Sequence, residues 1–279
     1  MCIRDSTRDN NKIIDAKILL GNINIENLND HFKKYINVIS FWLKKDLHSV
    51  ISSLQNIISD HKKDILAIRL LHFNNIFIGI DSNFLRKHLE ILGNWTNKDP
   101  FYNLILGMTS FAYEENDELS LAQNLANESL AMSKKDLWSW HALLHVQDNE
   151  LSSDLESNEF FRSIDWSQYG AIKRHIWWHQ ALMHFYKKDF IKCLEMFDNF
   201  IFSEDEFYLD FCNTSSLLLR LHYQGVDVEQ RMRKLQSLAN YFCEQQLIPF
   251  IDYHLIPVSY THLRAHETEA DLVCRLLLE

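Results

Sequence analysis

Three aspartates that each precede a helical pattern of apolar residues recur at a regular spacing. Asp64, Asp99 and Asp136 lie 35 and 37 residues apart, and Asp64 and Asp136 each follow two lysines. Aspartate is favoured at this place because its carboxylate accepts hydrogen bonds from the free N–H groups of a helix's first turn. A period of this length predicts helix pairs that cannot bury their apolar faces alone and therefore stack on one another.

The shortage of helix-breaking residues supports this interpretation. The 279-residue chain has only 6 glycines and 3 prolines, whereas 47% of its residues are hydrophobic and 13% are aromatic. Few tight turns and ample core material indicate an all-α protein. The sequence therefore predicts an α-solenoid of stacked antiparallel helix pairs similar to tetratricopeptide repeats, whose period is about 34 residues.

Apolar residues at three- and four-residue steps predict where the helices lie. The expected helical segments are 13–20, 25–43, a helix through Val50, Leu54 and Ile58, 65–79, a helix capped by Asp81 and Ser82 that runs through Leu92, 104–117, 118–133, 136–146, 151–163, 168–187, 190–202, 208–224 and 227–246. Gly93 and Gly225 are expected to end helices, and Pro100 to occupy a first turn. Asp165 and Trp166 are expected in a loop.

The two ends of the chain differ from the rest. Met1–Ser6 and Val258–Glu279 resemble translated sequencing-adapter read-through, and neither continues the helical pattern beside it. We expect residues 1–6 to be an artefactual or disordered leader and residues 258–279 an artefactual tail. The repeat domain is accordingly predicted to cover residues 7–257.

Charge and cysteine content limit the classes of partner. The net charge is −10, which is a poor match for phosphate backbones, so no nucleic-acid partner is expected. No apolar run reaches about 18 residues, so neither a transmembrane helix nor a membrane partner is expected. Cys193, Cys212 and Cys243 lack CxxC spacing and are typical of reduced core residues, which favours a cytoplasmic location.

Two tryptophan-rich segments carry paired histidines. His141 and His145 lie in DLWSWHALLHV, and His175 and His179 in HIWWHQALMHF. Residues four positions apart share one face of a helix, so each pair of imidazoles is expected to lie together.

Five segments, in this order and spacing, resemble the tetratricopeptide repeat protein 38 family, a group of divergent repeat proteins of bacteria and animals. They are LGMTSFAYEEND (106–117), DLWSWHALLHV (136–146), HIWWHQAL (175–182), NTSSLLLRLHYQG (213–225) and PFIDYH (249–254). The resemblance implies a tetratricopeptide-like stack whose first helices line a concave groove. The residues that it implies for this groove are His141, His145, His175, His179, Glu114, Glu115, Trp140 and Trp178.

Three interpretations of the histidines remain open. They can belong to a packed aromatic–polar seam, form a surface that binds a peptide or a small polar ligand, or hold a transition metal. We expect a non-catalytic interaction protein that has no cofactor and binds a protein or peptide segment in its groove. The alternative is a metal-dependent enzyme in which His141, His145, His175 and His179 bind zinc or iron, with a carboxylate as extra ligand or general base.

Overall fold

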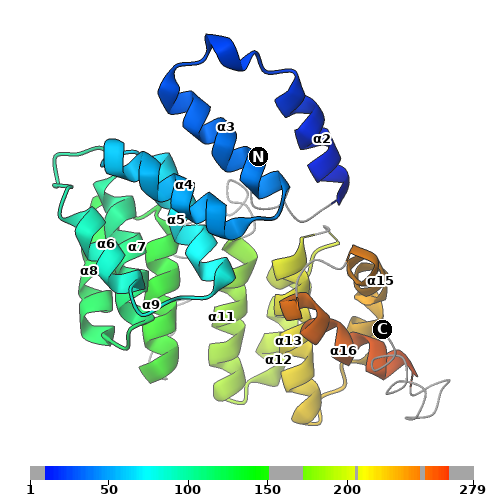
Figure 1. Cartoon of the computed structure of the whole chain (residues 1–279). Helices are drawn as coiled ribbons and strands as arrows, with labels where there is room; N and C mark the ends of the chain where they lie inside the picture. Colours follow the sequence, from blue (N-terminus) through cyan, green and yellow to red (C-terminus); the bar gives the residue numbers. More distant parts are fainter. Residues whose placement is uncertain (1–9, 151–171, 205–206, 246–248, 264–279) are drawn as a thin grey trace. The chain divides into compact units, whose positions relative to one another are not determined.

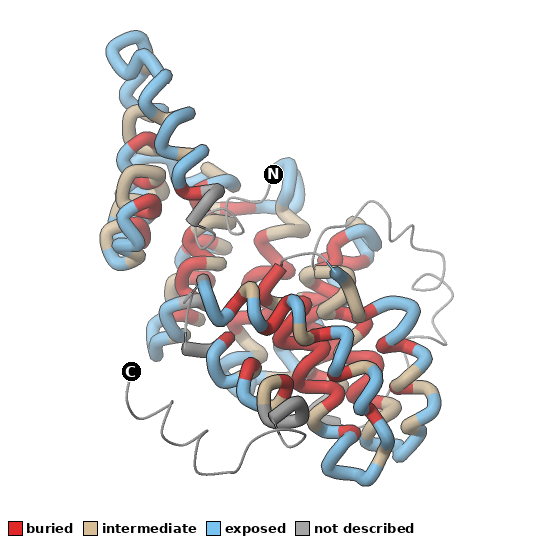
Figure 2. Tube along the Cα trace, turned by 90° about the vertical axis from the view of Figure 1, so that its right-hand side faces the viewer, coloured by how far each residue is buried: buried red, intermediate tan, exposed pale blue. Residues whose placement is uncertain are grey.

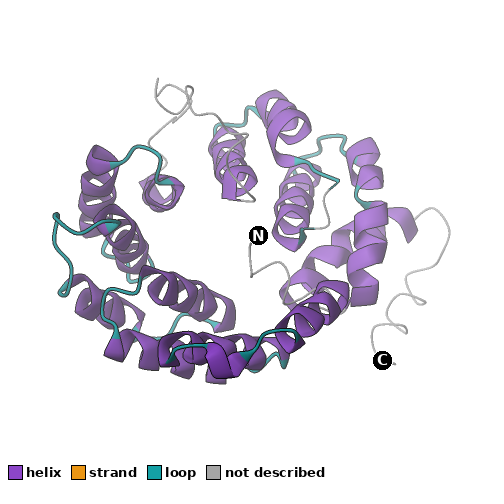
Figure 3. Ribbon diagram, turned by 90° about the horizontal axis from the view of Figure 1, so that it is seen from above, coloured by secondary structure: helices purple, strands orange, loops and turns teal. Residues whose placement is uncertain are grey.

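The structure is a computed structural model, and it describes residues 10–150, 172–204, 207–245 and 249–263. Every regular element in these ranges is helical and none is a strand, as Figure 3 shows, which confirms the all-α prediction. None of the helices in the described ranges is both long and apolar enough to cross a membrane. The chain divides into two compact units, unit 1 (Met1–Asn149) and unit 2 (Glu150–Glu279).

Unit 1 follows the predicted helices closely (Figure 1). Its elements are α2 (Asn10–Gly21), a short 3₁₀ turn η1 (Ile25–Asn27), α3 (Asp30–Leu43), α4 (Leu47–Asp60), α5 (Ile65–Ile78), α6 (Phe84–Leu92), α7 (Tyr102–Glu114), α8 (Leu119–Met132) and α9 (Leu137–Glu150). The helix expected from Ile25 begins five residues later. Asn29 determines this start, because its side chain accepts a hydrogen bond from the Phe32 N–H at 3.0 Å.

Unit 2 departs from the prediction in its second half. Its elements are α11 (Ile172–Tyr186), α12 (Phe190–Met196), a π-helical turn η4 (Phe197–Ile201), α13 (Tyr208–Tyr223), α14 (Glu229–Lys234), α15 (Gln236–Gln245) and α16 (Pro249–Leu263). The single helix predicted over 227–246 is divided at Leu235, which is fully buried. Helix α16 continues beyond residue 257, and Val258 is fully buried. The helix predicted at 151–163 and the loop at Asp165 and Trp166 lie outside the described residues.

Aspartates cap several of the described helices, and Asp64 is one of the three for which this was predicted. Asp46, Asp64 and Asp189 accept hydrogen bonds from N–H groups in the first turns of α4, α5 and α12, at 3.1, 3.0 and 3.2 Å. These bonds satisfy donors that have no partner inside the helix.

Asp99 does not play this part, and its predicted role as a helix start was wrong. Its carboxylate accepts from the N–H and hydroxyl of Thr96, at 2.8 and 2.9 Å. Helix α7 begins only at Tyr102, after Phe101 in the left-handed region (φ 68°). Pro100 therefore precedes the helix and does not lie in its first turn. A residue before proline is disfavoured in helical geometry, which delays the start.

One turn geometry recurs in both units. Lys45, Asp117 and Lys188 have φ 60°, and Gly225 has φ 79°. In each case the N–H of the following residue bonds to a carbonyl five residues earlier, at 2.9–3.1 Å, which closes a Schellman turn. These four residues are separated by 72, 71 and 37 positions, which are two, two and one periods of about 36 residues. Gly93, by contrast, ends α6 with right-handed geometry (φ −59°).

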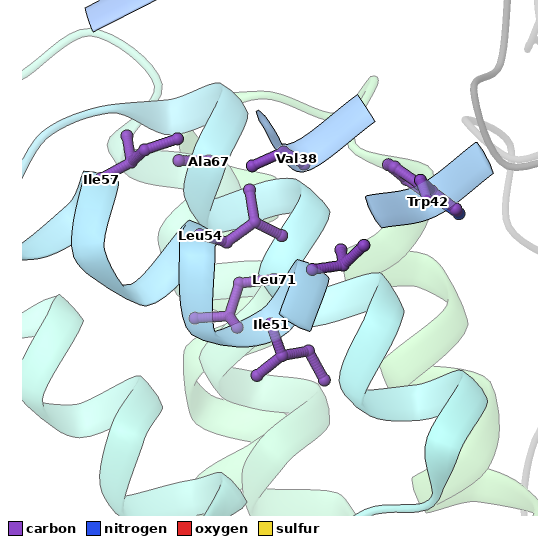
Figure 4. Packing of buried hydrophobic residues seen from close by; sticks show 8 residues of the cluster. Val38, Trp42, Ile51, Leu54, Ile57, Ala67 and Leu71 are labelled. Atoms are coloured by element: carbon purple, nitrogen blue, oxygen red, sulfur yellow. The ribbon is translucent and has the colours of Figure 1, made fainter. Parts of the chain in front are cut away.

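The core of unit 1 forms where helices meet. A buried cluster joins α3, α4 and α5, with Leu54 and Leu71 among its members (Figure 4). Burial follows the helix faces that meet neighbours, whereas the connecting turns are mostly exposed (Figure 2). Small residues allow α7 and α8 to approach closely, since Ser110 donates its hydroxyl to the carbonyl of the fully buried Ala122 at 2.7 Å.

Gly107 brings α7 against α9. A Cβ at this position would lie 2.6 Å from Oγ of Ser139 and 2.7 Å from Oδ2 of Asp136. Both of these side chains are buried, and Asp136 accepts hydrogen bonds from Ser139 and Ser129 at 2.9 and 3.1 Å. This approach places the end of α7 beside the middle of α9, where the predicted site residues of unit 1 lie.

Candidate functional site

The structure brings together the histidine pair of unit 1. Nε2 of His141 lies 3.0 Å from Nε2 of His145, and the rings meet edge to face at 4.5 Å. His141 is buried and His145 is half-buried. Phe111 of α7 stacks on His141, with ring centres 5.6 Å apart and planes inclined by 16°. The aromatic ring thereby restricts the orientation of the imidazole.

Two carboxylates from the end of α7 join this pair. Nδ1 of His145 lies 3.3 Å from Oε2 of Glu114. One donor atom from each of Glu114, Glu115 and His145 lies within 4.8 Å of the other two. The predicted candidates of unit 1 other than Trp140 therefore form one polar cluster.

The carboxylates of this cluster are poorly neutralised. Burial and the neighbouring charge of Glu114 raise the pKa of Glu115, while His145 opposes the shift. Among the described residues no lysine or arginine forms an ion pair with either glutamate. Oε2 of Glu114 is buried, and within the described chain it has no hydrogen-bond partner, since its contact with His145 lacks hydrogen-bond geometry.

The histidine pair of unit 2 has a similar arrangement with a different neighbour. Nε2 of His179 lies 3.2 Å from Nε2 of His175, and Nδ1 of His175 lies 3.1 Å from Oδ1 of Asn213 on α13. Because an amide oxygen only accepts, Nδ1 of His175 donates the hydrogen bond. The neighbouring helix thus supplies a neutral amide here, where unit 1 has carboxylates.

The two tryptophans among the predicted site residues differ in environment. Trp140 is buried and donates its indole N–H to the carbonyl of Lys134 at 3.0 Å, so it belongs to the packing of unit 1. Trp178 is half-buried and stacks on His175, with ring centres 5.4 Å apart and planes inclined by 15°. The guanidinium of Arg220 lies 5.8 Å from the centre of the Trp178 ring.

The sequence did not reveal a second histidine pair in unit 1, His72 and His88, both of which are buried. Nδ1 of His72 lies 2.9 Å from Nε2 of His88, and Nδ1 of His88 lies 2.9 Å from the carbonyl oxygen of Phe84. Burial lowers the pKa of His72 well below its usual value and lowers that of His88 to about 4. The available signal was a histidine among the apolar residues Leu70, Leu71 and Phe73 of α5, although such a residue does not reveal its partner.

A pocket in unit 1 was also not predicted. It has a volume of about 400 Å³ and lies between α4 and α6, with Leu71 of α5 contributing to its wall. The lining residues are Gln55, Ile58, Ser59, Lys62, Leu71, Arg86, Lys87, Glu90, Ile91 and Asn94. None of the residues predicted for the groove is among them.

Comparison with known proteins gives no family assignment. No family model matches the chain. No solved structure matches it either. The residues and geometry of the chain itself therefore carry the functional conclusions.

Proposed function

We propose that the chain is a tetratricopeptide-like helical repeat protein that binds a segment of a partner protein. The recurring Schellman turn is the observation that carries the repeat architecture, because one hairpin geometry returns at multiples of about 36 residues. The same period favours the resemblance to the tetratricopeptide repeat protein 38 family. In this architecture α3, α5, α7, α9, α11 and α13 are the first helices of their pairs.

Contacts between successive first helices support the same proposal. Nζ of Lys63, just before α5, lies 2.6 Å from Oδ1 of Asp99. Asp99 is 36 residues further along the chain and lies three positions before Tyr102, the first residue of α7. In unit 2, Arg174 at the start of α11 pairs with the buried Asp210 at the start of α13 at 2.9 Å, again 36 residues away. Equivalent positions in neighbouring repeats would make such contacts.

The pocket between α4 and α6 offers the docking surface in unit 1. Its floor is apolar, with Leu71 and the half-buried Ile58, and cationic side chains stand at its rim. Lys62 forms no ion pair among the described residues, whereas Arg86 pairs with Glu90 at 2.6 Å. Lys87 also pairs with Asp81, at 3.2 Å. The lining thus holds three cations and one acid, Glu90, which is a local excess of positive charge on a chain of net charge −10.

We therefore propose an acidic segment with one large apolar side chain as the partner. The apolar side chain would fill the floor, and carboxylates of the segment would meet Lys62 and Arg86. In tetratricopeptide terms α4 and α6 are second helices, so this surface is not the groove of first helices expected from the sequence. We propose the groove of first helices as a second binding surface for the same class of partner.

Selection from a displayed library of random peptides tests this proposal. Peptides enriched on the full chain should combine acidic residues with a leucine or an aromatic residue. The double variant Lys62→Glu/Arg86→Glu should lose this preference, because it reverses the charge of the rim. Arg233→Glu/Lys234→Glu is a matched control, since Arg233 forms a similarly exposed pair with Glu229 four residues away. An unchanged preference in the rim variant would contradict the assignment of this surface.

A further inference from the structure

We propose that Glu114, Glu115 and His145 form a site for one divalent transition-metal ion in unit 1, with zinc and iron(II) suited to the donor set. Their donor atoms already lie within 4.8 Å of one another. Donors that bind one ion at about 2.0–2.2 Å lie about 3–4 Å apart. The 3.3 Å between Nδ1 of His145 and Oε2 of Glu114 matches such a separation, and rotation of the exposed Glu115 side chain supplies the remaining adjustment.

The environment of Glu114 is an independent observation that points to a cation. Its side chain is only 10% exposed, and Oε2 has no hydrogen-bond partner within the described parts of the chain. A buried carboxylate oxygen without a partner is unfavourable, since the lost hydration is not replaced. A metal ion bound at Oε2 would replace the lost hydration of this oxygen.

The position of the two carboxylates strengthens the case. Glu114 is the last residue of α7 and Glu115 follows it directly. The carbonyl groups at this end of a helix carry partial negative charge, which disfavours anions there. Within the described ranges no lysine or arginine is paired with either glutamate. A divalent cation would neutralise both carboxylates at once.

His141 acts as a positioning residue in this arrangement. If Nδ1 of His145 binds the ion, its Nε2 carries the hydrogen and can donate to Nε2 of His141, 3.0 Å away. A hydrogen bond of this kind fixes the tautomer and the ring orientation of a metal ligand. Phe111 stacks on His141 and meets His145 edge-on at 5.7 Å, which restrains both rings before any ion is bound.

Unit 2 provides the chemical contrast. His175 meets the neutral Oδ1 of Asn213, to which its Nδ1–H donates. The amide satisfies the imidazole without a cation. The metal proposal therefore applies to the set in unit 1, and it does not depend on the peptide pocket because the two share no residue.

Titration of the metal-free full chain with cobalt(II) tests this site, since bound cobalt(II) absorbs in the visible range. We expect one equivalent to bind with visible absorption. Glu114→Gln, Glu115→Gln and His145→Gln should each weaken binding by about tenfold or more, because each removes one ligand. His141→Gln should also weaken binding by about tenfold, at unchanged stoichiometry, because it removes only the partner of a ligand.

The double variant His175→Gln/His179→Gln is the control and should bind cobalt(II) as the wild type does. Loss of binding in this variant, with binding retained in the glutamate variants, would show that histidines hold the ion and would overturn the proposal. Absence of stoichiometric binding to the wild type would overturn it as well. Circular dichroism of each metal-free variant shows whether its helices are intact, and the exposed Glu115 is the substitution least able to disturb them.

Discussion

Nδ1 of His72 lies 2.9 Å from Nε2 of His88, and both imidazoles are buried in unit 1. The carbonyl of Phe84 only accepts, so the Nδ1 of His88 that contacts it must carry a hydrogen. Nε2 of a neutral His88 then accepts from the Nδ1–H of His72. The chain of hydrogen bonds thus determines one tautomer for each neutral ring. Burial disfavours a positive charge on both of them.

This pair should make folding sensitive to acid. The folded-state pKa values of both histidines lie below those of the unfolded chain, so the unfolded chain takes up more protons as the pH falls. Stability is therefore fully present above about pH 6.5 and decreases toward pH 4. Between pH 7 and pH 5 the lowered pKa of His88 alone should cost about 2 kcal/mol of unfolding free energy, and that of His72 acts in the same direction.

Urea unfolding at the two pH values measures this dependence. The double variant His72→Phe/His88→Leu should lose most of it, whatever its absolute stability. His48→Gln, on an exposed residue of unit 1, should retain it. An equal pH dependence in wild type and double variant would contradict the neutral buried pair.

Gly107→Ala should destabilise unit 1 although alanine favours helices. The added Cβ would lie within 2.7 Å of the side chains of Ser139 and Asp136, which their own hydrogen bonds hold in place. Overpacking of this kind costs about 1–3 kcal/mol, more than the gain of about 1 kcal/mol in helix propensity. Thermal unfolding should show a lower midpoint. Gly21→Ala, with nothing within 4 Å of the new Cβ, should not lower it.

The turns of the helix pairs allow a reciprocal test. Lys45 and Lys188 adopt φ 60°, a left-handed geometry that costs a residue with a Cβ about 1–2 kcal/mol. Lys45→Gly and Lys188→Gly should raise the melting temperature, by less than this cost implies because glycine gains freedom in the unfolded chain. Gly225→Ala should lower the melting temperature, because it should reduce the free energy of unfolding by about 1 kcal/mol. A change of melting temperature in the same direction for the lysine-to-glycine variants and for Gly225→Ala would contradict the left-handed geometry of these turns.

Glu115→Gln should stabilise the metal-free chain by about 0.5 kcal/mol at pH 7. The substitution removes a negative charge from the end of α7 and from the neighbourhood of Glu114. Differential scanning calorimetry without metal should show a higher midpoint, and Glu128→Gln on the exposed face of α8 should leave it unchanged. If zinc binds as proposed, it should raise the midpoint of wild type more than that of Glu115→Gln.

The helices were largely predictable because their signals are local. Asp46 and Asp64 cap α4 and α5 through side chains that reach only three residues ahead. The division at Leu235 has no local signal, since neither glycine nor proline lies nearby. Leu235 is fully buried, so tertiary packing governs the break. Asp99 failed as a predicted helix start because its side chain bonds backward to Thr96.

The candidate site was predictable only in part. Four-residue spacing placed His141 beside His145 and His175 beside His179. It did not reveal that one pair meets Glu114 and the other Asn213, because those contacts join different helices. The partnership of His72 with His88 links α5 and α6 and was hidden for the same reason.

The Schellman turn that recurs between helices limits how the chain can gain or lose residues. In the proposed repeat architecture, duplication of a block of about 36 residues would add a module that begins and ends in the same bend, so its neighbours would keep their surfaces. Inserting a single residue within a helix would instead rotate every later side chain of that helix by about 100°. Growth by whole modules is thus the change in length that this backbone accommodates most easily.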